Sequence, residues 1–145
     1  MSTFRGTLWA LLLSAAALGA TGSATIQVTD AWIRWLPGNL PSGGYLTVTN
    51  AGDHAVSLTA ASCADYGSVT LHQSRQQGGV ASMNPVSALT IPPHSTLAFE
   101  ARGYHLMLEQ AKQPIKPGDH IIITLQFASG PAIPVQFEVR APAPP

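Results

Sequence analysis

GYHLML, residues 103–108, has the alternation of a β-strand. Residues two apart in a strand point to the same side, so His105 and Met107 share one face while Leu106 and Leu108 share the other. The leucine face is apolar and suits a core, which places the histidine and the methionine on the outer face or the rim of the sheet. If Met107 were a core residue instead, both faces would be buried and His105 would lie in apolar surroundings without an evident partner.

Short apolar or β-branched runs recur on both sides of this segment, and clusters of Gly, Pro, Asn and Asp separate them. We expect strands at 26–28, 31–34, 44–50, 56–61, 68–73, 79–86, 96–100, 105–109, 120–127 and 133–139. Apart from one short turn at 109–112, no segment has the period of a helix. The pattern predicts a single all-β domain, a β-sandwich with Greek-key connections.

The first 24 residues are predicted to be a signal peptide. Arg5 supplies a positive charge, the apolar stretch 8–20 is far shorter than the ~20 residues of a membrane span, and small residues allow cleavage after Ala24. The alternative is that this segment is not cleaved and stays on the chain as an anchor. No cysteine lies near this site, so we expect neither a lipid anchor nor stable membrane insertion. The remaining chain divides into a domain at 25–140 and a proline-rich tail at 141–145, which we expect to be extended.

The charge balance argues against nucleic acid as a partner. Removal of residues 1–24 takes one of the seven Lys and Arg residues and none of the seven Asp and Glu residues, which leaves a net charge near −1. Such a chain has no electrostatic attraction for a polyanion. Cys63 is the only cysteine and cannot form an internal disulfide, although an exported protein would permit one. We expect a monomer stabilised by its core alone or with metal.

Four candidate metal ligands follow one another at defined distances. His72, Met83, His105 and Met107 form the pattern His-x10-Met-x21-His-x-Met. Once the signal is removed, Met83 and Met107 are the only methionines, although Leu, Ile or Val would serve equally well as apolar filler. A single histidine or methionine at a strand end is weak evidence, because most such residues are surface or core residues. The inference therefore depends on the set of four.

The donor types select the metal. Two thioethers and two imidazoles suit Cu(I), whereas zinc recruits Cys, His or carboxylate, and calcium and magnesium prefer oxygen. A blue-copper site needs a thiolate, and Cys63 lies before His72 rather than among the downstream ligands.

No motif for hydrolysis or phosphate binding is present, so we expect no enzyme. Two alternatives to a copper carrier stay open: a structural β-sandwich interaction module, and a copper redox or electron-transfer protein.

The spacing of the four residues resembles that of the PCuAC family of periplasmic copper chaperones. His72, Met83, His105 and Met107 match the family pattern in type and distance, and the likeness extends over residues 28–139. The resemblance implies a cupredoxin-like fold, an exposed Cu(I) site and a periplasmic location. It also implies delivery of copper to the copper subunit of cytochrome c oxidase, at its binuclear centre, alongside Sco-type thiol proteins.

The chain departs from the family at two places. Many members carry a further methionine beside the first histidine, where this chain has Gln73 and Ser74. Some end in a tail rich in His and Met, whereas residues 141–145 read Ala-Pro-Ala-Pro-Pro. We therefore expect one Cu(I) ion, and the sequence leaves open whether a second site, in particular one for Cu(II), exists.

Overall fold

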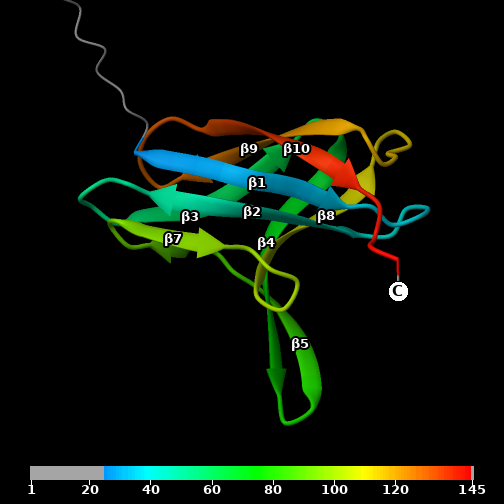
Figure 1. Ribbon diagram of the computed structural model, residues 1–145, viewed down its shortest axis with the longest axis horizontal. Helices are drawn as coiled ribbons and strands as arrows, with labels where there is room; N and C mark the ends of the chain where they lie inside the picture. The colour runs from blue at the N-terminus through cyan, green and yellow to red at the C-terminus, as the bar shows by residue number, and fades with distance from the viewer. Residues whose placement is uncertain (1–24, 145) are drawn as a thin grey trace, which may run out of the picture.

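The computed structural model describes residues 25–144, which form strands, turns and loops. The strands are β1 (Ile26–Arg34), β2 (Ser42–Asn50), β3 (Val56–Cys63), β4 (Tyr66–Gln77), β5 (Val80–Pro85), β6 (Leu89–Ile91), β7 (Ser95–Ala98), β8 (Tyr104–Ala111), β9 (His120–Phe127) and β10 (Ile133–Arg140) (Figure 1). The predicted signal peptide, residues 1–24, and the last residue of the predicted tail lie outside the described residues. Within this range, no helix long and apolar enough to span a membrane is found.

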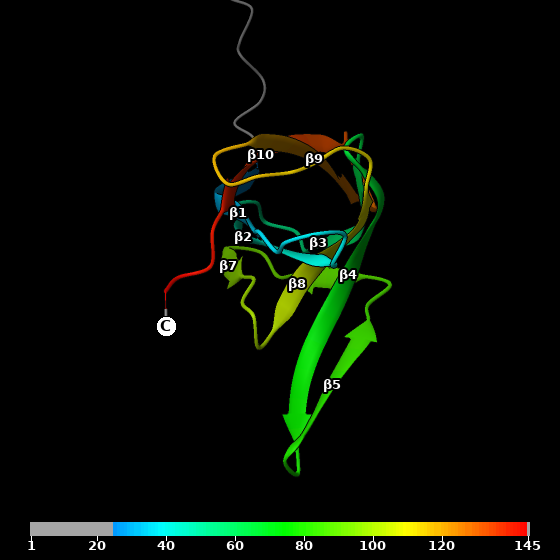
Figure 2. The same cartoon turned by 90° about the vertical axis from the view of Figure 1, so that its right-hand side faces the viewer.

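The strands are joined into one mixed sheet that curls around a single core. The order is β5-β4-β8-β2-β1-β10-β9-β3-β6, and β7 pairs with β2. Only β1 and β10 run parallel, and this pair connects the two halves of the sheet. The view along the strands shows β9 and β10 on one side of the core, with β1 and β2 next to them (Figure 2). The prediction of a single all-β domain is confirmed, with the layers of the expected sandwich connected into one sheet.

Three details differ from the strands predicted. The first two segments, 26–28 and 31–34, form one strand, β1, which is interrupted by a bulge between Thr29 and Trp32. β6 was missed because three residues are too few to show a period. The helical turn predicted at 109–112 is wrong, since β8 continues as a strand to Ala111.

The core is built from alternating strand residues. The fully buried apolar side chains are Ile33, Leu46, Val48, Leu58, Ile91, Leu106, Leu108, Ile123, Leu125, Phe137 and Val139. Burial of one such side chain contributes about 1.5–3 kcal/mol, so these residues supply most of the driving force for folding. Leu106 and Leu108 lie in the core as predicted, which turns His105 and Met107 to the opposite face of β8.

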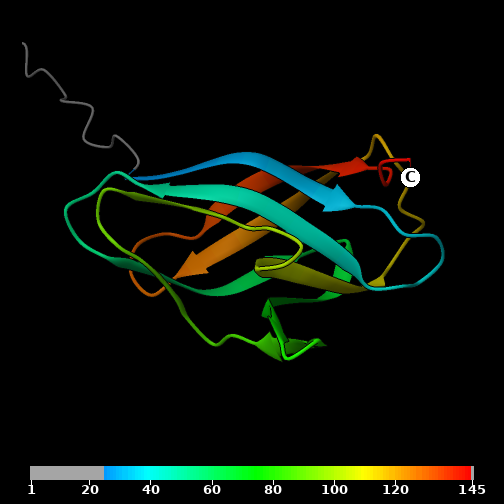
Figure 3. The same cartoon turned by 60° about the horizontal axis from the view of Figure 1, so that its bottom comes forward.

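The hairpin of β4 and β5 projects from the body of the domain (Figures 1 and 3). Gly78 and Gly79 form its tip with φ values of 59° and 79°, the left-handed region that a tight two-residue hairpin turn requires. All six residues of β5 are exposed, and Met83 lies near the middle of this strand. The hairpin therefore holds a methionine out from the core, at the edge of the sheet.

Asn50 connects the end of β2 to the segment between β6 and β7. Its side chain is fully buried and donates hydrogen bonds to the carbonyl oxygens of His54, Ile91 and Pro92 at 2.8, 3.1 and 3.1 Å. Its Oδ1 accepts a hydrogen bond from the Gly52 amide at 3.0 Å. The two N–H groups of this amide are shared among the three carbonyl oxygens, so one side chain contacts four backbone groups.

We expect Asn50→Ala to lower the free energy of unfolding by roughly 1–3 kcal/mol, because it leaves buried carbonyl groups without donors. Urea unfolding followed by circular dichroism measures the change. Asn39→Ala, which removes an exposed asparagine, is the matched control and should change stability by less than about 0.5 kcal/mol. Equal stability of the two variants would contradict the role assigned to Asn50.

Candidate metal centre

His105 lies on the face of β8 that points away from the core, yet only 5% of it is exposed. Its Nδ1 lies 3.3 Å from the carbonyl oxygen of Gly103 and must donate to it, because a carbonyl oxygen can only accept. The proton is then on Nδ1, and Nε2 has a free lone pair. This Nε2 is buried and has no hydrogen-bond partner among the described residues. A buried acceptor without a donor is costly, so the geometry suits a ligand at Nε2.

His72 is the cross-strand neighbour of His105. The two residues are paired between β4 and β8, and their rings are stacked with centroids 5.9 Å apart and planes inclined by 19°. The Nδ1 of His72 lies 3.3 Å from the hydroxyl of Thr70. The register of the sheet thus brings together two histidines that are far apart in the sequence.

The two methionines approach His105 from different strands. Met107 follows two residues later on β8, and Met83 is paired with Ser74 on the projecting hairpin. Met83, His105 and Met107 line one hollow of about 230 Å³. Met83 is 51% exposed, so this hollow is open on the side of the hairpin. Three of the four predicted ligands therefore line the same hollow, and His72 lies beside it against His105.

The donor set is soft and uncharged. No acidic side chain lines the hollow, and the described residues contain no group of three or more His, Cys, Asp or Glu that could hold a metal ion. Cys63 is paired with Ile123 on β3 and β9 and does not line the hollow, and burial raises the pKa of its thiol. Imidazole and thioether donors without an anionic partner suit a soft monovalent ion better than zinc or calcium.

The sequence did not identify three further residues at the hollow, Arg34, Gly43 and Tyr45. A side chain at Gly43 would displace the Tyr45 ring, because a Cβ there would lie 2.6 Å from the Tyr45 hydroxyl oxygen. A glycine inside a strand often marks such a close approach, and the Gly43-Gly44 pair was the available signal. Tyr45 in turn packs on Trp32, with ring centroids 4.8 Å apart.

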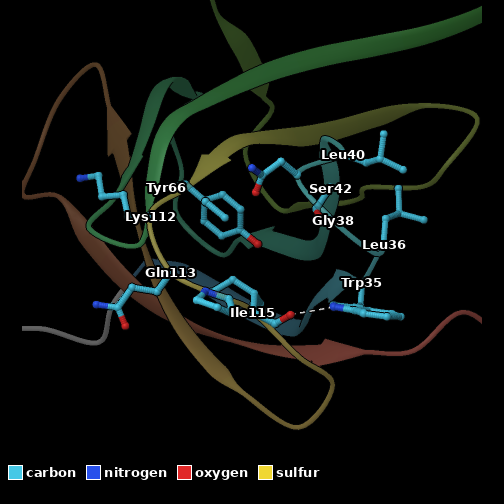
Figure 4. A pocket seen from close by; sticks show the side chains of 12 residues that line it. Trp35, Leu36, Gly38, Leu40, Ser42, Tyr66, Lys112, Gln113 and Ile115 are labelled. Atoms are coloured by element: carbon cyan, nitrogen blue, oxygen red, sulfur yellow. Dashed lines mark hydrogen bonds between the residues drawn. The ribbon is translucent and has the colours of Figure 1, made fainter.

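Two larger hollows adjoin the centre. One, of about 350 Å³, lies between the loops that follow β1 and β8, and shares Leu36 and Ser42 with the centre (Figure 4). The indole nitrogen of Trp35 donates to the Ile115 carbonyl at 2.7 Å and connects the two loops there. The other, of about 630 Å³, includes Trp32 and tail residues 141–143. The centre thus lies in the middle of a hollowed surface.

The family model described as "Putative lipoprotein LpqE-like" matches residues 26–139. The chain belongs to the LpqE-like family. A curated protein of this kind, "Putative lipoprotein Lxx21020" from Leifsonia xyli, is 30% identical over 116 residues, which are 79% of this chain and 69% of that protein.

Solved copper-binding proteins have the same fold. The Cu(I) form of DR1885 from Deinococcus radiodurans is 31% identical, with a TM-score of 0.67 over 87% of this chain and 85% of that one. The copper-bound PCuAC domain from PmoF2 has a TM-score of 0.69 over 81% of this chain and 94% of that domain, and at 24% identity it is evidence for the fold alone. The predicted relationship to the PCuAC proteins is therefore confirmed, and so is the PCuAC-like fold.

The buried His105 predicts a pH dependence for the metal-free protein. Burial, partly offset by the hydrogen bond to Gly103, holds the pKa of His105 below its usual value. The unfolded chain takes up this proton near pH 6.5 and the folded chain only at lower pH, so stability falls as the pH decreases through about 6.5. Urea unfolding between pH 8 and pH 5 should show this loss in the wild type and a smaller loss in His105→Gln.

His120→Gln is the control for this experiment, since His120 is an exposed residue at the start of β9. Its pH dependence should follow that of the wild type. If His105→Gln lost stability with pH as steeply as the wild type, the burial of a neutral His105 would have no energetic consequence and the interpretation would be wrong.

Proposed function

We propose that the protein is an exported copper chaperone that holds one Cu(I) on His72, Met83, His105 and Met107 and delivers it to the binuclear copper centre of cytochrome c oxidase. The observation that supports it most is the buried Nε2 of His105, which has no partner among the described residues, in a side chain that lines the same hollow as Met83 and Met107. The proposal involves binding and release of the ion without turnover of a substrate.

Each proposed ligand has a distinct part in the site. His105 is the buried donor, held in its tautomer by the Gly103 carbonyl, and its lowered pKa keeps it neutral at physiological pH. Met107 lies on the same rigid strand. Met83 is on the exposed hairpin, where an acceptor can reach it first. A site with one deep histidine and one exposed thioether suits a carrier that must give up its ion.

A copper-loaded relative supports the choice of metal. DR1885, at 31% identity, was solved with Cu(I). The chemistry of this chain agrees, because thioethers bind soft cations and add no charge that would attract a divalent ion. An electron-transfer protein with a thiolate ligand is less well supported, since Cys63 does not line the hollow.

An exported location agrees with the description of the family as lipoproteins. The cleavable signal at residues 1–24 is part of the proposal. Cys63, the only cysteine of the printed sequence, lies within β3, so we do not carry the lipid attachment of the relatives over to this chain.

Replacement of both methionines tests the metal site. We expect Met83→Leu/Met107→Leu to keep the fold, because leucine conserves the apolar volume. Removal of both soft donors should lower the Cu(I) affinity by at least about a hundredfold, since loss of an outer-shell contact alone costs 10–100-fold. A competition titration against a Cu(I) chelator, with Zn(II) in parallel, measures this. His120→Gln is the control and should bind Cu(I) like the wild type; equal affinity of the double variant, or a wild type that prefers Zn(II), would contradict the site.

Delivery is tested separately with the soluble copper-binding domain of a cytochrome c oxidase. We expect the Cu(I)-loaded protein to pass its ion to the reduced, metal-free domain, because an acceptor that binds Cu(I) through thiolates offers softer, anionic donors than thioethers. Native mass spectrometry counts the copper on each protein. Retention of copper by the loaded protein, under conditions in which a chelator removes it, would argue against this acceptor.

A further inference from the structure

A row of paired residues leads from the metal centre to the other side of the sheet. Arg140 on β10 is paired with Arg34 on β1, Arg34 with Gly43 on β2, and Gly43 with Met107 on β8. Paired residues lie on the same face, so these four share the face that carries the proposed copper ligands. Since Gly43 has no side chain, the end of the Tyr45 side chain occupies the space above it, between the strands that carry Arg34 and Met107.

The two arginines of this row differ in their partners. Arg140 forms an ion pair with Glu138, with a nitrogen-to-oxygen distance of 3.0 Å, and its guanidinium lies 5.6 Å from the centroid of the Trp32 ring. Arg34 has no ion-pair partner among the residues that the structure describes, although it is placed directly beside another arginine. Glu138 neutralises Arg140, whereas the exposed Arg34 keeps an uncompensated positive charge that is accessible to an anion.

Tyr45 provides a second polar group at the same place. Its hydroxyl oxygen lies above Gly43, 2.6 Å from the position that a Cβ would take, and the side chain lines the hollow together with Arg34, His105 and Met107. No hydrogen bond of this hydroxyl to a described residue is found in the structure. A guanidinium and a phenol, both without partners, therefore adjoin the proposed copper ligands.

The charge of the copper-loaded site would also favour an anion next to the proposed ligands. Two imidazoles and two thioethers are neutral, so bound Cu(I) would keep its full positive charge, and Arg34 adds a second one. None of the residues that line the hollow is acidic. The hollow of about 230 Å³ has room for a further donor, since a water molecule occupies about 30 Å³.

We propose that Arg34 and the Tyr45 hydroxyl form a binding position for an anionic soft donor, the thiolate of a cysteine on the acceptor protein, next to His105 and Met107. The inference rests on the proposed function and adds the chemistry by which the ion leaves. The acceptor thiol loses its proton to solvent, its sulfur forms a bond to copper, and a thioether bond to copper breaks. Copper stays in the Cu(I) state, so no oxidant or reductant is needed. Arg34 and Tyr45 stabilise the negative sulfur as it enters.

The first arm of the test uses the metal-free protein and bromide as the probe. The methyl groups of Met83 and Met107 are the only methionine signals of the exported chain, so NMR resolves them directly. We expect bromide to shift the Met107 signal in the wild type and to have little effect in Arg34→Gln. Equal shifts in the two proteins would overturn the anion site.

The second arm measures how fast Cu(I) leaves the loaded protein. Dithiothreitol is the thiol acceptor, and neocuproine, a neutral nitrogen chelator, is the reference. We expect the ratio of the two rates, thiol over neocuproine, to fall about tenfold in Arg34→Gln and less in Tyr45→Phe, because Arg34 contributes a full positive charge as well as hydrogen bonds, whereas the Tyr45 hydroxyl is neutral. Arg34→Lys, which keeps the charge, should recover part of the ratio.

Arg75→Gln is the matched control. Arg75 lies on the same hairpin as Met83, but its side chain contacts Gln73 on the other face of β4. Its ratio should equal that of the wild type; an unchanged ratio in Arg34→Gln, or an equal fall in Arg75→Gln, would overturn the proposal. If the wild type did not bind Cu(I), the proposed function would fail, and the bromide arm would still decide whether the anion site exists.

Discussion

The burial of Leu106 and Leu108 in the core is the constraint on which the site depends. Because side chains alternate along a strand, two leucines that face inward turn His105 and Met107 to the other side of β8. A shift of one residue in the register of β8 would exchange the two sets, and would place a thioether and an imidazole in the core. The hydrophobic effect that holds the domain together thus also sets the direction of two of the proposed copper ligands.

The histidine that results is unusual for an outer face. It is almost completely buried, its tautomer is fixed by a backbone carbonyl, and its second nitrogen has no partner among the described residues. Such a group lowers the stability of the metal-free fold, and a bound soft cation would remove that cost. In the metal-free protein the proposed site is therefore already organised around His105, with one exposed thioether on a hairpin that extends away from the domain.

The neutral imidazoles and thioethers of the proposed site distinguish it from sites that hold divalent ions through anionic ligands. Neutral donors and an adjacent arginine disfavour divalent ions, which need anionic ligands, and make the neighbourhood of the ion attractive to anions. An acceptor with cysteine thiolates fits this environment, because its negative charge is drawn to the place where the ion is bound. In the proposed chaperone the methionines would set the affinity for the cation, and Arg34 would set the access of its next ligand.

Local alternation allowed the sequence alone to predict the all-β fold, most of the strands and the two faces of β8. The types and spacing of His72, Met83, His105 and Met107 were also sufficient to predict the family, because donor chemistry is a property of the residues themselves. The tertiary structure decided the pairing of His72 with His105, the burial of His105, and the approach of Arg34 and Tyr45 to Met107 across Gly43. These features depend on the order and register of strands that are distant in the chain, and a local period contains no information about which strand lies beside which.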